Sequence, residues 1–274
     1  MSKKSPAVSV IISFYKKIDY LILLLEGFKQ QSFRDFEVII ADDGSPADIV
    51  RQIEKLSEDF PFPLRHLWQE DKGFRKNRIL NRAVVAAGAE YILFVDGDCI
   101  PHPEFVKEHY QNREESTVLT GRRVNLSEKI TSQITPEKIA DGWLWKKPFS
   151  LYMDGIFGKS YDVEKGIYIR NGYLRDFMNR KKRGVLGCNF SAFKDDLLAV
   201  NGFDERYEAP SIGEDSDIQF RMELTGCDLK SLNGIAVQYH LYHKLQPRLQ
   251  VNLDLFEQVK SEKLAFTPFG IKSS

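Results

Sequence analysis

The sequence contains few cysteines and no long apolar run. Its three cysteines, Cys99, Cys188 and Cys227, are odd in number and lack the spacing of a disulfide framework or a zinc site. The apolar stretch 18–25 contains Asp19 and is far shorter than a membrane span. We therefore expect a protein of a reducing compartment, with neither a signal peptide nor a transmembrane helix, and hence a cytoplasmic location.

The sequence also lacks an excess of charge of either sign. Its 274 residues include 39 Lys and Arg against 39 Asp and Glu. A nucleic-acid-binding protein normally carries a basic surplus, so we expect no nucleic-acid partner. The length suits one large domain, or a compact domain with a C-terminal extension.

Alternating strands and helices dominate the first half of the chain. Short runs rich in β-branched and aromatic residues predict buried strands, and apolar residues at helical spacing predict helices between them. The expected strands are 8–14, 36–41, 64–68 and 91–95, and the expected helices are 19–31, 46–57, 77–87 and 103–112. This order predicts an α/β fold with a mainly parallel sheet and right-handed crossovers.

Carboxylates follow two of these strands, as Asp42-Asp43 and as Asp96-Gly97-Asp98. Ligands bind outside the carboxyl ends of strands in open α/β sheets, so these side chains are expected at a binding site. Oxygen donors at this spacing suit Mg²⁺ or Mn²⁺, and a neighbouring carboxylate can accept hydrogen bonds from a base or ribose. Solvated turns and helix caps also favour Asp and Gly, which is the alternative explanation.

A basic loop, 71–78, lies between these two acidic motifs in the sequence. Its cations could meet a diphosphate, since arginine presents two parallel donors to phosphate oxygens. A solvated surface loop would have the same composition.

A second acidic cluster, Glu214, Asp215 and Asp217, occurs where a helix over 216–225 is expected to begin. Negative charge stabilises a helix N-terminus, which could explain part of the cluster. Three carboxylates in four residues also repel one another, and such crowding can raise one pKa and prepare a general base. If Ser216 opens the helix, Asp215 is its N-cap and Asp217 is rotated away.

Together these motifs resemble those of family-2 glycosyltransferases of GT-A fold. The resemblance rests on 8–14, 36–45, 73–75 and 96–98, in that order, and on 187–221, which is similar to the C-terminal segment of galactosyltransferases and chondroitin-polymerase-type enzymes. It implies a UDP-sugar donor, with galactose or N-acetylgalactosamine favoured, a divalent metal (Mn²⁺ or Mg²⁺) and inversion at the anomeric carbon. The implied acceptor is a glycan or a lipid-linked glycan of surface polysaccharide biosynthesis.

The same resemblance implies roles for individual residues. Asp215 would be the base, and Glu214 a contact to the acceptor or donor sugar. Asp42 or Asp43 would contact the nucleotide base, Asp96 the ribose or the metal, and Asp98 the metal. The remaining implied nucleotide contacts are Ser13, Arg75 and Arg78.

Two histidines extend this implied site. His240 and His243 end an expected strand over 236–244, where residues three apart point to opposite faces unless a turn intervenes. The resemblance places one histidine on the metal; we favour His240, with His243 as a contact to the diphosphate or in a second site. Either could instead be a buried structural histidine.

The segment 122–185 mixes aromatic and basic residues without a clear period. An insertion of this length predicts a binding loop or lid, and its composition suits sugar rings or an anionic membrane surface. Peripheral association with the inner face of a membrane is therefore also expected, although ordinary packing would explain many of the aromatics. After it, a peripheral helix is expected over 249–264, followed by a loose end.

We expect a nucleotide-sugar-binding half, 1–121, and an acceptor-binding half, 122–274, within one compact domain. Two other functions fit parts of the sequence. A nucleotidyltransferase could share the sheet and the aspartate pair but would leave 213–215 without a role, and a non-catalytic binding module would need no base.

Overall fold

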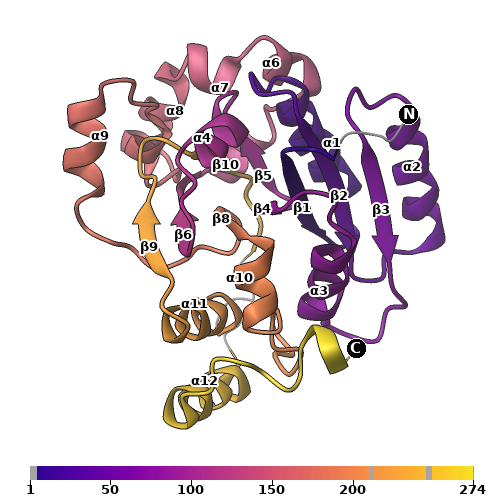
Figure 1. The fold of residues 1–274 in the computed structure, drawn as a ribbon. Coiled ribbons are helices and arrows are strands. Elements are labelled where there is room, and N and C mark those ends of the chain that lie inside the picture. Colours follow the sequence, from indigo (N-terminus) through magenta and orange to yellow (C-terminus); the bar gives the residue numbers. More distant parts are fainter. Residues whose placement is uncertain (1–4, 210–212, 245–248, 274) are drawn as a thin grey trace.

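Two β-sheets form the framework of the computed structural model, which describes residues 5–209, 213–244 and 249–273 (Figure 1). The larger sheet has the order β3-β2-β1-β4-β8-β6-β9, and the smaller one β5-β10-β7. The strands are β1 (Val8–Phe14), β2 (Phe36–Asp42), β3 (Leu64–Trp68), β4 (Tyr91–Asp96), β5 (Cys99–Pro101), β6 (Thr117–Thr120), β7 (Arg122–Asn125), β8 (Phe190–Phe193), β9 (Asp228–Ser231) and β10 (Val237–His240). In the larger sheet β8 is antiparallel to both of its neighbours, and the other pairings are parallel.

Helices cover both faces of the larger sheet. The helices of the described residues are α1 (Ile18–Lys29), α2 (Ala47–Glu58), α3 (Lys76–Ala86), α4 (Phe105–Gln111), α5 (Glu128–Thr131), α6 (Pro136–Ala140), α7 (Trp143–Lys146), α8 (Phe149–Phe157), α9 (Gly172–Asn179), α10 (Lys194–Ala199), α11 (Glu214–Leu224) and α12 (Gln250–Glu262), with 3₁₀ turns at Val163–Gly166 and Ile271–Ser273. The predicted α/β fold class is thereby confirmed.

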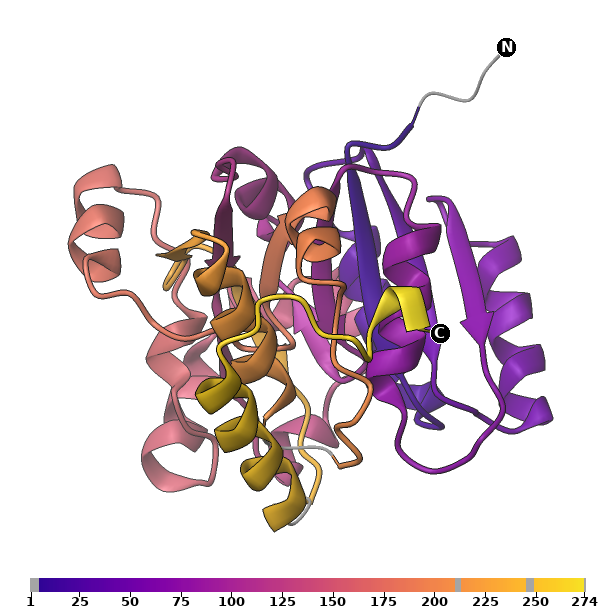
Figure 2. The same cartoon turned by 60° about the horizontal axis from the view of Figure 1, so that its bottom comes forward.

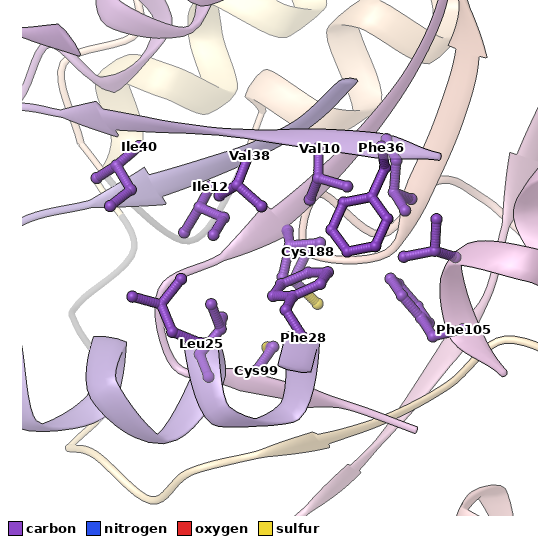
Figure 3. Packing of buried hydrophobic residues seen from close by; sticks show 14 of the residues in the cluster. Val10, Ile12, Leu25, Phe28, Phe36, Val38, Ile40, Cys99, Phe105 and Cys188 are labelled. Atoms are coloured by element: carbon purple, nitrogen blue, oxygen red, sulfur yellow. The ribbon is translucent and has the colours of Figure 1, made fainter. Parts of the chain in front are cut away.

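Alternating side chains of the central strands enter two separate cores. Val10 and Ile12 of β1 pack with α1 and α2, and Figure 3 shows them facing Leu25 and Phe28. Ile11 points to the other face, where α3, α10 and α11 cover it. A strand buried on both faces is mostly apolar, which is why these segments read as nearly continuous apolar runs.

A third core surrounds the smaller sheet. It buries Ile130, Ile139, Leu144 and Leu151 of helices α5 to α8 against Tyr239 of β10. The expectation that 122–185 forms a loop or lid is thus wrong for this part, which is helical and packed. Both sheets contain strands from either side of position 121.

The predicted start of one helix is corrected. Helix α11 begins at Glu214 rather than Ser216, because Gly213 precedes it with a φ of 105°. A Cβ at Gly213 would lie 2.5 Å from the Tyr207 ring, so glycine is required there. Asp215 is consequently in the first turn and is not the N-cap.

The segment after α12 packs against the body of the molecule, as Figure 2 shows for the yellow C-terminal stretch. The Ile271 N–H donates to the Asn201 carbonyl at 2.9 Å, and Thr267 Oγ1 donates to Asp204 Oδ2 at 2.7 Å. The expected loose end is therefore incorrect. Within the described residues, no helix has both the length and the apolarity to span a bilayer.

Candidate active site

A cleft of about 780 Å³ opens at the carboxyl ends of β1 and β4. The direction of strand order reverses between these two strands, and ligands of open α/β sheets bind at such a reversal. Most of the predicted site residues line this cleft: Ser13, Asp43, Asp96, Asp98, Glu214, Asp215, His240 and His243. Lys76 and Arg123, which were not singled out from the sequence, line it as well.

Asp96 is held at the end of β4 by two neighbours. Ser13 Oγ donates to Asp96 Oδ1 at 2.6 Å, and Lys76 Nζ lies 3.1 Å from the same oxygen. The parallel register pairs Ser13 with Asp96, which explains this contact. Burial alone would raise the pKa of Asp96, but the Lys76 cation lowers it, so this carboxylate is ionised.

Lys76 is a cation of the cleft that was not singled out from the sequence, where its neighbours Arg75 and Arg78 were chosen instead. Its Nζ also lies 3.9 Å from Glu214 Oε1, so one ammonium group connects β4 with α11. Burial would lower the pKa of Lys76, yet the charges of Asp96, Glu214 and Asp215 raise it. Its place within the basic loop 71–78, at the start of α3, was the available signal.

The two predicted arginines are placed differently. The Arg75 backbone N–H donates to Asp43 Oδ2 at 2.8 Å, while its guanidinium donates to the Glu70 carbonyl. Arg78 is exposed on α3 and is not among the residues lining the cleft. Neither arginine is among the residues that line the cleft, and a contact of either side chain with the nucleotide stays a prediction.

Asp42 and Asp43 have different environments. Asp42 is fully buried, accepts hydrogen bonds from Ser45 and lies 3.0 Å from His66 Nε2, so it does not reach the cleft. Asp43 lines the cleft, and burial raises its pKa against the opposing hydrogen bonds from Arg75 and Gln69. Of these two aspartates, only Asp43 is among the residues that line the cleft.

Asp98, His240 and His243 form a compact group of metal-type ligands whose donor atoms all lie within 4.8 Å of one another. Asp98 Oδ2 is 3.6 Å from His240 Nε2 and 3.2 Å from His243 Nε2, and the two imidazole nitrogens are 3.1 Å apart. Burial would raise the pKa of Asp98, but the two histidines lower it. Hydrogen bonding to Asp98 raises the pKa of His243.

Strand pairing brings these ligands together. His240 is opposite Cys99 in the antiparallel β10–β5 register, and the Leu241 N–H donates to the Asp98 carbonyl at 2.9 Å. Because β10 ends at His240, the chain turns and returns His243 to the same side, contrary to the alternation expected of a longer strand. Asp96 lies outside this group. One carboxylate with two imidazoles fits Mn²⁺ better than Mg²⁺, which prefers oxygen ligands alone.

Glu214 and Asp215 enter the cleft from the first turn of α11. The Gly187 N–H donates to Asp215 Oδ2 at 2.8 Å and thereby orients this carboxylate. Burial and the adjacent Asp215 raise the pKa of Glu214 to about 7. Burial also raises the pKa of Asp215, opposed by the Lys76 charge.

Asp217 has a structural environment instead. Its Oδ2 lies 2.6 Å from Arg221 Nη2, and both side chains are 1% exposed. This ion pair lies inside the protein, away from the residues lining the cleft.

The model of glycosyl transferase family 2 matches residues 9–182, well over half of the chain. The chain belongs to this family. A second model, the N-terminal domain of galactosyltransferase, matches residues 176–244, which include α11 and β10.

Several family-2 relatives and solved structures are similar to the chain. Chondroitin synthase of Escherichia coli is 27% identical over 250 residues, covering 85% of this chain and 34% of that protein. Putative glycosyltransferase EpsH of Bacillus subtilis is 28% identical over 119 residues, covering 42% of this chain and 33% of that protein. The chain thus spans about a third of the length of these relatives.

Among solved structures, TarS of S. aureus matches with a TM-score of 0.54 at 18% identity, covering 86% of this chain and 36% of that one. The mannosyltransferase PcManGT of Pyrobaculum calidifontis, solved with GDP-Man and Mn²⁺, matches with a TM-score of 0.55 at 14% identity, covering 88% and 59%. At identities this low, structural matches are evidence for the fold alone. These two matches confirm the expected GT-A fold.

Proposed function

We propose that this chain transfers a sugar from a UDP-sugar to a hydroxyl group of a glycan or lipid-linked glycan, with inversion at the anomeric carbon. The observation that carries the proposal is that a single cleft contains nucleotide-type carboxylates, a metal-type ligand group and a crowded carboxylate pair. A binding module would need the first of these features but not the third.

The donor nucleotide would lie along the ends of β1, β2 and β4. Asp43 can accept a hydrogen bond from the N3–H of uracil, and the Ser13–Asp96 pair can accept hydrogen bonds from ribose hydroxyls. A solved TarS complex contains UDP-GlcNAc, which supports a UDP-sugar. The match to a galactosyltransferase domain supports galactose or N-acetylgalactosamine, with glucose-type sugars next.

Asp98, His240 and His243 would hold the divalent cation, Mn²⁺ in preference to Mg²⁺. When bound, this cation supplies positive charge that stabilises the departing UDP. Asp96 remains ionised beside Lys76 and adds to the orientation of the donor.

Asp215 would act as the general base. It takes the proton of the acceptor hydroxyl while that oxygen bonds to the anomeric carbon and the bond from this carbon to the UDP oxygen breaks on the opposite face. The Gly187 N–H fixes its orientation. Glu214, next to it and close to Lys76, would contact the acceptor or the donor sugar. No covalent intermediate is required, because inversion takes one displacement.

A panel of nucleotide sugars tests the donor assignment. With Mn²⁺ present, UDP-galactose or UDP-N-acetylgalactosamine should raise the melting temperature most, and mass spectrometry should detect one added hexose or N-acetylhexosamine on an oligosaccharide acceptor. Stabilisation by GDP- or CMP-sugars alone would refute the assignment. Asp48→Ala, an exposed carboxylate on α2, serves as a control that should leave donor binding unchanged.

A further inference from the structure

Helix α9 has the reverse of the usual orientation of an amphipathic helix. Two of its polar side chains contact the protein, although Asp176 is exposed. The Arg175 guanidinium donates two hydrogen bonds to the Glu108 carboxylate at 2.7 and 3.1 Å. One turn later, Asn179 exchanges hydrogen bonds with the backbone of Asn233 at 2.7 and 3.1 Å. Residues four apart lie on the same face, so this is the side on which α9 is anchored.

The apolar residues of α9 face outward. Tyr173 is 89% exposed and Phe177 64%, and these two lie about half a turn away from Arg175 and Asn179. Leu174 and Met178 flank them and are also exposed. No described residue of α9 is buried. A surface helix normally turns its apolar side inward. The outward apolar side chains of α9 therefore indicate that an apolar partner, either a lipid bilayer or another protein surface, covers this helix.

The positive charge around α9 indicates that its apolar partner is also anionic. Residues 172–183 contain five basic residues and one acidic residue, although the charges of the whole chain balance. The run Arg180-Lys181-Lys182-Arg183 directly follows the helix, and the Arg180 guanidinium lies 5.3 Å from the centre of the Phe177 ring. Outward aromatic and aliphatic side chains beside a cationic run match the boundary between headgroups and acyl chains of an anionic bilayer.

The position of α9 also connects this surface with the cleft. After the basic run, the chain continues into Val185 and Leu186, which line the cleft. Helix α8, at the same end of the molecule as α9 and opposite α2 and β3 (Figures 1 and 2), exposes Phe149, Ile156 and Phe157. We propose that α9 and the basic run dock the protein on an anionic lipid surface, with the cleft close to that surface.

This docking surface goes beyond the proposed transfer reaction and is tested without it. Cosedimentation with phosphatidylcholine vesicles, with and without phosphatidylglycerol, should show binding only to the anionic vesicles, weakened by added salt. The double variants Tyr173→Ser/Phe177→Ser and Arg180→Gln/Lys181→Gln should each reduce this binding on the order of tenfold. Neither should lower the melting temperature, since no substituted side chain is buried.

Matched controls are available elsewhere on the surface. Arg51→Gln/Lys55→Gln removes two exposed charges from α2, and Val85→Ser removes an exposed apolar side chain from α3. Both should bind vesicles like the unaltered protein. Equal binding to neutral and anionic vesicles, or unchanged binding by both α9-region variants, would overturn the proposal.

A second copy of the chain is the competing occupant. A dimer detected by sedimentation velocity and abolished by Tyr173→Ser/Phe177→Ser would assign the surface to self-association and also overturn the proposal. Transfer to a water-soluble oligosaccharide should be unaffected by the α9 variants. A failure of lipid docking is therefore distinguishable from a failure of the proposed reaction.

Discussion

Lys76 is the residue that connects the donor side of the cleft with the carboxylate pair. Its ammonium group lies 3.1 Å from Asp96 and 3.9 Å from Glu214, and its positive charge opposes the rise in pKa that burial causes in Glu214 and Asp215. At neutral pH this cation helps to keep a base deprotonated inside a partly buried cluster.

Transfer should consequently depend on pH through this pair. Glu214 has a pKa raised to about 7, so the rate should fall as the pH drops below about 7 and the pair takes up a proton. Lys76→Met removes the opposing charge, should raise both carboxyl pKa values further, and should move the acidic limb of the pH–rate profile to higher pH. The loss at pH 7 should be on the order of tenfold.

Lys76→Arg, which keeps the charge, should retain most of the original profile. Lys72→Met, in the exposed part of the same loop, should not change it at all. An unaltered acidic limb in Lys76→Met would show that the lysine does not control the carboxylate pair.

The assignment of the base to Asp215 rather than Glu214 is a second prediction at this scale. Asp215→Asn should bind the UDP-sugar normally and transfer at least ~100-fold more slowly, because a base acts only in the transition state. Glu214→Gln should weaken substrate binding as well as rate. Asp195→Asn, an exposed first-turn carboxylate of α10, is the matched control and should be fully active. Near-normal transfer by Asp215→Asn together with an inactive Glu214→Gln would reverse the two roles.

At the scale of elements, α11 has two functions. Its first turn presents Glu214 and Asp215 to the cleft, and one turn later the buried Asp217–Arg221 pair fixes the helix in the protein, where Arg221 also donates to the Val200 carbonyl at 2.8 Å. The position of Asp215, the proposed base, therefore depends on an ion pair that does not line the cleft.

Asp217→Asn should destabilise the fold by about 3–5 kcal/mol, since it leaves the buried Arg221 cation without its partner. Urea unfolding monitored by circular dichroism measures the difference. The exposed Glu257–Lys260 pair of α12 provides the comparison, and Glu257→Gln should change the free energy of unfolding by no more than about 0.5 kcal/mol. Equal effects of the two substitutions would contradict a special role for the buried pair.

The elements differ in how far the sequence predicted them. Strands β1, β2 and β4 were predicted because both of their faces are buried, which gives each of them a clear apolar run, whereas β3 is a partly buried edge strand with a weaker pattern. The start of α11 was missed by two residues because its acidic first turn resembled a cap, whereas Gly213 sets the boundary through its backbone conformation. The sequence did not predict that His243 lies on the same side as His240. This arrangement depends on where β10 ends, and β10 pairs with β5, which is distant in the sequence.

The same distinction holds for the site residues. Asp43, Asp96, Asp98, Glu214, Asp215 and His240 were singled out because acids and histidines at strand and helix ends carry a local signal, and they line the cleft. Lys76 was covered only by the general prediction for the basic loop, and Arg123 became evident only in three dimensions. Asp42 and Asp43 are identical and adjacent in sequence, and only the direction in which each side chain points separates them.

At the scale of the whole molecule, the cleft is assembled from segments that are far apart in the chain. β1 and β4 provide its base, α11 and the segment 185–188 line it, and β10 delivers the histidines. The C-terminal segment contacts the turn after α10, through Thr267 and Asp204. Because one cleft contains the residues proposed for the donor, the metal and the base, sugar transfer should require all three at once.

The most direct measurement is the release of UDP from the preferred UDP-sugar, with an acceptor present, with Mn²⁺ or with EDTA. The account predicts release and transfer by the unaltered protein only with Mn²⁺, none by Asp98→Ala in either condition, and normal activity of Asp48→Ala. Asp98 lies beyond the end of β4, so its replacement should leave the melting temperature of the metal-free protein nearly unchanged. Full activity in EDTA, or in Asp98→Ala, would contradict a metal-assisted transfer in this cleft.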